Sequence, residues 1–175
     1  YIVPGIVALI LLIITIFLTS MGIVREKEIG TLEQLLVTPI RSSQLIIGKI
    51  VPFSILGFLE MAIAIGFVYL FFGIGVEGSL WLLFLESAIF ILTTLGVGIL
   101  ISTISESQQQ ALFVGWFFMI FAILLSGFFI PIPNMPDAIQ YLTYLNPLRY
   151  FLVILREIYL KGTPIQYLLT ETLAM

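Results

Sequence analysis

Four long apolar runs dominate this chain. Residues 1–24 contain no charged side chain, and runs of similar character follow at 45–72, 80–104 and 111–130. About 20 mostly apolar residues in a helix are needed to cross the hydrocarbon of a bilayer. Of the 175 residues, 61% are hydrophobic and 10% charged, whereas a soluble domain is about half apolar and a quarter charged. The sequence therefore predicts an all-α fold, a polytopic transmembrane helix bundle forming a single domain over residues 1–175.

The last third of the chain is less regular. The proline-rich stretch 131–136 ends the fourth run, because proline removes a backbone donor and clashes with the preceding turn. A short helix is expected before Asn146-Pro147. The apolar run at 148–160 is too short to span, so we expect it to lie in the interface or to dip back into protein, where broken structure at membrane depth is tolerated. Residues 165–175 resemble the start of a further span.

Several residue types are absent, and their absence excludes whole classes of function. The chain has no His and no Cys, which rules out imidazole and thiol nucleophiles, HExxH zinc sites and Cys-ligated metals. The formal net charge is -3, with 7 Lys and Arg against 10 Asp and Glu. A protein that binds nucleic acid by its backbone is normally basic. We therefore expect no metal site and no nucleic-acid partner.

The sequence also lacks the motifs of ATP hydrolysis and intramembrane proteolysis. A P-loop requires GxxxxGK[ST], but the Gly48-Lys49 pair is followed by Ile50 and preceded at position 43 by Ser43. Asp137 is the single aspartate, so a paired-aspartate protease site is impossible. We predict that this chain is not an enzyme.

The segment 25–39 is polar enough to leave the bilayer but keeps an apolar stripe. Apolar side chains recur there at helical spacing: Ile29, Leu32, Leu35 and Leu36. This pattern predicts an amphipathic helix, with Glu26 and Glu28 in its first turn, where carboxylates oppose the helix dipole favourably. Thr38-Pro39 is expected to end it. Such a helix either joins two spans along the interface or docks onto a cytosolic partner, and periodicity alone does not separate these alternatives.

Four motifs in order along the chain carry a resemblance to a known family. They are REKEIGTLEQLLVTP at 25–39 followed by Gly48-Lys49, STISESQQQA at 102–111, Ser126-Gly127 running to Pro131-Ile132-Pro133, and YLNPLRY at 144–150. In this combination the chain resembles the permeases of ABC-2 type transporters, and the resemblance covers nearly its whole length.

The resemblance implies a six-span permease, of which two halves pair with two ATPase subunits. It implies that ATP and Mg²⁺ are held by the partner ATPase, with no cofactor in this chain, and that an extracellular domain separates the first two spans. Tyr1 would then begin at the second span of a longer protein. The first loop, 25–49, would be cytoplasmic, in a bacterial or archaeal cytoplasmic membrane. The 25–49 loop holds four basic residues, and the loops on the opposite side of the membrane hold three; this bias also favours a cytoplasmic 25–49 loop.

The resemblance also implies site residues. In the first loop of such permeases a coupling helix sits in a cleft of the ATPase, and the positions that match are Glu26, Glu28, Gly30, Thr31, Glu33, Gln34, Leu35, Leu36, Thr38 and Pro39. The Asn146-Pro147 region and the short helices around it would form an extracellular lid, with Asn146, Pro147 and Arg149 as its key residues.

Glu60 and Glu86 are carboxylates inside predicted spans. A charge at the bilayer centre costs on the order of 3 kcal/mol, so it normally faces protein or water. Both are candidates for a substrate or ion pathway. Alternatively, Glu60 pairs with a hydroxyl or another helix, and Glu86 lies near the outer headgroups.

Two other functions remain open from the residues alone. A secondary transporter or channel would use Glu60 for cation or proton coupling, although we find no inverted repeat of the kind such folds commonly show. A membrane scaffold without transport activity is the third alternative.

Small residues at every fourth position predict close helix packing. Thr94, Gly98 and Ser102 form one stripe, and Ala111 and Gly115 form another. In lipid, such stripes let two helix backbones approach closely. We expect packing, and no ligand, at both.

Overall fold

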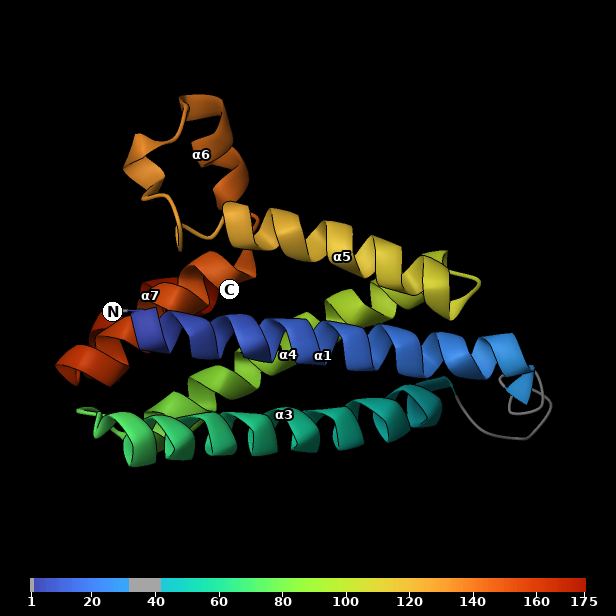
Figure 1. Cartoon of the computed structure of the whole chain (residues 1–175), viewed down its shortest axis with the longest axis horizontal. Helices are drawn as coiled ribbons and strands as arrows, with labels where there is room; N and C mark the ends of the chain where they lie inside the picture. The colour runs from blue at the N-terminus through green and yellow to red at the C-terminus, as the bar shows by residue number, and fades with distance from the viewer. Residues whose placement is uncertain (1, 32–41) are drawn as a thin grey trace.

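The structure is a computed structural model that describes residues 2–31 and 42–175. Three long helices form the body of the bundle (Figure 1): α1 (Ile2–Ile29), α3 (Ser42–Phe72) and α4 (Leu80–Ile104). Within the described ranges, these three are long and apolar enough to cross a membrane. α5 (Gln108–Leu124) is apolar but shorter. The described residues contain no strand. The prediction of an all-α, polytopic membrane bundle is confirmed.

Short helices complete the chain after α5. They are η1 (Ile132–Asn134), α6 (Asp137–Thr143), α7 (Pro147–Lys161), η2 (Ile165–Tyr167) and α8 (Leu169–Ala174). Figure 1 shows α6 standing away from the bundle beyond the end of α5, while α7 lies at the end where α1 begins. α5 stops before the apolar run does, and Gly127 turns the chain with a φ of 78°, a conformation that glycine adopts without strain. The region that resembled the start of a further span holds η2 and α8.

α1 extends well beyond its apolar residues. The expectation that a separate amphipathic helix begins at residue 25 is wrong, because α1 continues through Glu26 and Glu28 to Ile29. Those residues include good helix formers, and nothing before Gly30 interrupts the helix. Gly30 has a φ of 79°, and the Thr31 hydroxyl donates to the Glu26 carbonyl at 3.0 Å. Glu26 and Glu28 therefore lie in the last turns of α1, where they do not favour the helix dipole.

α1 and α4 are in close contact through the small-residue stripe. Thr15 donates a hydrogen bond to Thr94 at 2.9 Å between the two hydroxyl oxygens, and both side chains are buried. A β-carbon placed on Gly98 would lie 2.7 Å from Cβ of Thr19 and 3.2 Å from the carbonyl oxygen of Ile16. The predicted packing role of this stripe is confirmed. α5 contacts α1 in the same way, because a β-carbon on Gly115 would lie 3.0 Å from the Phe17 ring.

α7 dips into protein, which decides between the two expectations for the run at 148–160. One of its faces is buried, through Leu148, Phe151, Leu152, Ile154, Leu155, Ile158 and Tyr159. The Phe151 ring stacks on Phe90 of α4, with centroids 4.0 Å apart and an interplanar angle of 5°. α7 also contacts α1. It is therefore a core element of this end of the bundle.

The loop between α3 and α4 holds the C-terminal end of α7. The last carbonyls of a helix lack partners within the helix. Here the Gly78 amide donates to the Ile158 carbonyl at 3.1 Å, and the Glu77 amide donates to the Tyr159 carbonyl at 3.2 Å. Gly162 ends α7 with a φ of 64°. These backbone contacts join α7 to the α3–α4 loop, and the Tyr159 hydroxyl adds a side-chain contact by donating to the Ile74 carbonyl of the same loop at 3.2 Å.

Candidate functional site

Charged residues at the end of α1 connect it to its neighbours. Glu26 forms an ion pair with Lys49 of α3. Lys27 donates to the carbonyl of Ser105, which follows α4, at 2.9 Å. The side-chain amide of Gln108, the first residue of α5, donates to Glu28 at 2.8 Å. We call these contacts the α1-end network. Through it, the last turns of α1 contact α3 and the α4–α5 turn, so these parts are expected to move together.

The α1-end network flanks the predicted coupling residues. Of the ten, Glu26, Glu28, Gly30 and Thr31 are described, and they lie where α1 ends. The remaining six lie outside the described residues: Glu33, Gln34, Leu35, Leu36, Thr38 and Pro39. α1 ends at Ile29, and α3 begins at Ser42. The Glu26–Lys49 ion pair therefore joins α1 and α3, the two helices on either side of the predicted coupling residues.

Asn146 joins α5 to α7 at the opposite end of the bundle. Its side-chain amide donates to the Ala122 carbonyl of α5 at 2.7 Å, and its side-chain oxygen accepts from the Leu148 amide at 3.2 Å. It is thus the N-cap of α7, and Pro147 occupies the first helical position, where a missing N–H costs nothing. The side chain is buried. The sequence Asn-Pro therefore starts α7 and fixes that start to α5.

Arg149 and Tyr150 hold α6 against the start of α7. Arg149 donates to the hydroxyl of Thr143, the last residue of α6. Its guanidinium also lies over the Tyr144 ring, 4.2 Å from the centroid. The Tyr150 hydroxyl donates to the Tyr144 carbonyl at 2.9 Å. The YLNPLRY motif is thus a set of contacts that fixes the α6–α7 corner.

We expect Asn146→Ala to destabilise the protein by about 2–3 kcal/mol, since it removes a helix cap and leaves the Ala122 carbonyl buried without its partner. The midpoint of thermal unfolding in detergent measures this effect. Asn134→Ala is the matched control, because the Asn134 side chain is exposed. Equal midpoints for the two variants would contradict the assigned role of Asn146.

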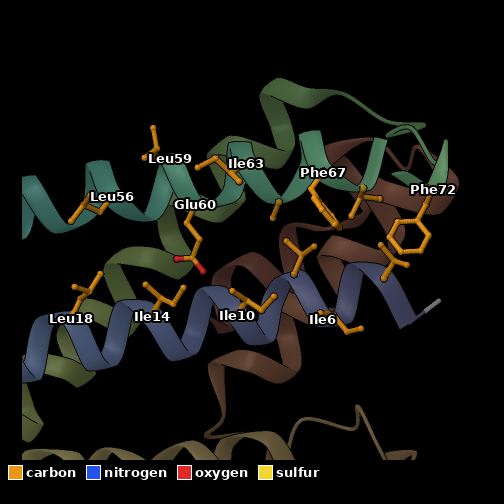
Figure 2. A pocket seen from close by; sticks show the side chains of 14 residues that line it. Ile6, Ile10, Ile14, Leu18, Leu56, Leu59, Glu60, Ile63, Phe67 and Phe72 are labelled. Carbon is orange, nitrogen blue, oxygen red and sulfur yellow. The ribbon is translucent and has the colours of Figure 1, made fainter. Parts of the chain in front are cut away.

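Glu60 lies in an apolar groove between α1 and α3. Figure 2 shows its side chain leaving α3 and pointing toward α1, near Ile10 and Ile14. The groove has a volume of about 580 Å³ and is lined by 14 residues. Both carboxylate oxygens of Glu60 are buried, and neither has a hydrogen-bond partner among the described residues. The expectation that Glu60 pairs with a hydroxyl has no support in the described part of the chain.

Glu86 has different surroundings from Glu60. Its side chain is fully buried in α4, and one carboxylate oxygen accepts a hydrogen bond at 2.9 Å from the Thr172 hydroxyl of α8. It does not line the groove that holds Glu60. The structure therefore does not bring the two candidate pathway residues together. Glu86 instead connects α4 to the C-terminal segment.

Comparison with known proteins identifies the family of this fold. The family model for ABC-2 type transporters matches residues 1–160. The chain belongs to the ABC-2 type transporter family. The family assignment agrees with the expectation of an integral membrane protein of the ABC-2 permease family.

Curated relatives carry the same assignment. The chain is 43% identical over 162 residues to the probable multidrug ABC transporter permease YbhR of Escherichia coli K12, covering 92% of this chain and 44% of YbhR. It is 40% identical over 163 residues to YbhS of the same organism, covering 93% of this chain and 43% of YbhS. The linearmycin resistance permease protein LnrN of Bacillus subtilis is 26% identical over 154 residues, covering 86% of this chain and 40% of LnrN. The chain thus spans less than half the length of these relatives. No solved structure matches it.

The ABC-2 motifs contain contact residues whose roles sequence reasoning missed. The 102–111 motif supplies Ser105 and Gln108, which contact Lys27 and Glu28. The Glu26–Lys49 pair could have been found from the opposite charges at the facing ends of two helices joined by one loop, but the sequence analysis did not use that signal. No comparable signal pointed to Thr172 as the partner of Glu86.

Proposed function

We propose that this chain is the membrane part of the permease subunit of an ATP-driven exporter. The match to the ABC-2 family over residues 1–160 carries the proposal. Two further facts support it: the relatives at 40–43% identity are named multidrug ABC transporter permeases, and the chain has three helices of spanning length within its described residues.

The proposed partners follow from the family. Two ATPase subunits would bind ATP and Mg²⁺, and a second permease subunit, identical or related, would complete the pathway within the lipid bilayer. The loop at 25–49 would face the cytoplasm, where the ATPase subunits lie. The proline-rich turn, α6 and the start of α7 would then form a lid at the outer face, with Asn146, Pro147 and Arg149 fixing its base.

The α1-end network suggests how ATP hydrolysis acts on the spans. In this proposal the ATPase binds residues 32–41, and closing of the ATPase pair moves the adjacent ends of α1 and α3. Glu26–Lys49 couples the movement to α3, and Lys27 couples it to Ser105 at the end of α4. The proposed role of Glu26 and Glu28 is therefore to transmit movement within the membrane domain, whereas direct docking falls to the residues after Gly30.

Charge reversal at Glu33 tests the coupling surface. The full-length permease is purified in mild detergent from cells that also make the ATPase of the same operon. We expect the ATPase to copurify with the wild type, and Glu33→Lys to lower ATP-driven transport at least about tenfold, because like charges across an interface cost several kcal/mol. Glu77→Lys is the matched control, because Glu77 is exposed at the other end of the bundle.

Two results would overturn this proposal. If no ATPase copurifies with the wild-type permease, the proposal of an ATP-driven exporter is wrong. Transport that stops when the proton gradient is collapsed, with ATP held constant, would instead favour the secondary transporter that uses Glu60.

A further inference from the structure

The groove between α1 and α3 combines an extended apolar wall with one acid. α1 contributes residues from Val3 to Leu18, and α3 contributes residues from Leu56 to Phe72. At 1.5 Å per residue, these stretches are about 22 and 24 Å long. Glu60 is the only charged side chain among the 14 that line the groove. The groove is thus long enough for an extended ligand and carries a single negative group.

The Glu60 carboxylate is placed for a ligand that brings its own positive charge. Figure 2 shows it pointing into the space between the two helices, and both oxygens lack a hydrogen-bond partner among the described residues. An ionised carboxylate in apolar surroundings is costly unless a cation lies beside it. A cation bound here would remove that cost, so charge complementarity favours a cationic ligand over a neutral one.

The surroundings of Glu60 favour an organic cation over a metal ion. A hard metal ion requires several oxygen ligands, and the described residues include no group of three His, Cys, Asp or Glu that could hold a metal. The groove instead offers aliphatic side chains and, toward its far end, the rings of Phe67 and Phe72 (Figure 2). Its volume of about 580 Å³ lies within the range of pockets for drug-sized ligands.

The groove opens toward the outside of the bundle. Leu59 and Ile63, on the α3 side, are 57% and 63% exposed, and Ile6 on the α1 side is 44% exposed. In a membrane protein, apolar side chains exposed in this way face hydrocarbon. A ligand would therefore reach Glu60 from the lipid, which requires a molecule that partitions into the bilayer despite its charge.

We propose that the α1–α3 groove is a binding site for lipophilic organic monocations, with the Glu60 carboxylate as the counter-ion. The inference deepens the proposed exporter function and rests on it for its physiological meaning. Binding itself needs neither ATP nor the ATPase subunits. It can therefore be measured on the permease alone, separately from transport.

Equilibrium binding of radiolabelled tetraphenylphosphonium tests the site. The full-length permease is reconstituted in phosphatidylcholine nanodiscs without its ATPase, and triphenylphosphine oxide, a neutral molecule with three of the same rings, is the competitor. We expect saturable binding of the phosphonium and weak competition by the neutral oxide. Glu60→Gln should weaken phosphonium binding about tenfold or more, since contacts to charged groups are the strong ones. Glu60→Asp should retain most of the affinity.

Two further variants make the result specific. Glu86→Gln removes a buried carboxylate outside the groove and should leave binding unchanged. Ile14→Trp adds bulk on the α1 wall beside Glu60 and should weaken binding while the acid is kept. The unfolding midpoint of each variant shows whether it is folded, and Ile14→Trp carries the test if Glu60→Gln does not fold, because unchanged phosphonium binding in folded Ile14→Trp would place the site outside the groove.

Three outcomes would overturn the site. Equal affinity of wild type and folded Glu60→Gln would show that the carboxylate is not the counter-ion. A loss of phosphonium affinity in Glu86→Gln equal to that in Glu60→Gln would show that the effect is not specific to the groove. Disulfide cross-linking of Ile63→Cys between two copies, in a full-length permease from which any cysteine outside these 175 residues has been removed, would show that a second permease covers the groove. ATP-driven transport that persists in any of these cases would leave the exporter proposal intact.

Discussion

Gly98→Leu is expected to prevent α1 and α4 from packing and to destabilise the bundle by about 3 kcal/mol or more. The β-carbon alone would lie 2.7 Å from Cβ of Thr19 and 3.2 Å from the Ile16 carbonyl oxygen. The second contact is to backbone, so the neighbour cannot move aside by changing a rotamer. Separation of the helices would also break the buried hydrogen bond between Thr15 and Thr94, one turn away, which contributes about 1 kcal/mol.

Gly96→Leu is the matched control for this prediction. Gly96 lies on the same helix, and a β-carbon there would meet no atom within 4 Å. Both substitutions remove one glycine from α4 and add one leucine, so helix propensity changes equally. Unfolding midpoints of the full-length protein in detergent, with the fraction that elutes as a single species, measure the difference. Equal loss in both variants would contradict close α1–α4 packing as the source of stability.

The contact at Gly98 could be predicted from sequence because the information is local. Small residues at every fourth position must lie on one face of a helix, and in lipid that face is the one that packs. Likewise, the long runs predicted the three long helices, since hydrocarbon forces every backbone group to be satisfied within its own segment. The stripe did not indicate which helix would pack against it, and the structure shows that this helix is α1.

The predicted end of α1 is wrong, because the change from apolar to polar residues was interpreted as the end of the helix. The change from Val24 to Arg25 marks where the chain becomes polar, but Arg, Glu and Lys are good helix formers. The backbone therefore stays helical until Gly30, which has a positive φ. As a result, Glu26 and Glu28 belong to α1, and their partners are Lys49 and Gln108.

The two intramembrane acids show the limit of sequence reasoning on the candidate site. Glu60 and Glu86 both occur in long apolar runs, and hydropathy cannot tell them apart. Their difference is tertiary: Glu86 contacts Thr172, 86 positions away in the chain, whereas Glu60 faces the α1–α3 groove. A carboxylate's role depends on the helix that faces it, and no local pattern identifies that helix.

Gly78→Val is expected to release the C-terminal end of α7 from the α3–α4 loop. A β-carbon on Gly78 would lie 2.6 Å from the Ile158 carbonyl oxygen and 3.1 Å from Cα of Gly162, and both atoms belong to backbone. Relief of this clash requires the loop to move away, which breaks the hydrogen bonds that the Gly78 and Glu77 amides donate to the carbonyls of Ile158 and Tyr159. Each such hydrogen bond is worth about 1 kcal/mol.

Hydrogen exchange of the α7 amides measures this release, with Gly75→Val as the control. A β-carbon on Gly75 would come no closer than 3.9 Å to the Tyr69 ring, so the same residue change in the same loop is tolerated there. We expect exchange of the Glu77 amide, which loses its own hydrogen bond, and of the last turns of α7, which lose their contact with the loop, to rise at least about tenfold in Gly78→Val, because two lost hydrogen bonds exceed the ~1.4 kcal/mol of a tenfold change. Since Phe151 stacks on Phe90, the first turns should stay protected. Equal protection of the last turns in both variants would mean that side-chain packing alone holds α7, and that the backbone contacts to the loop contribute nothing.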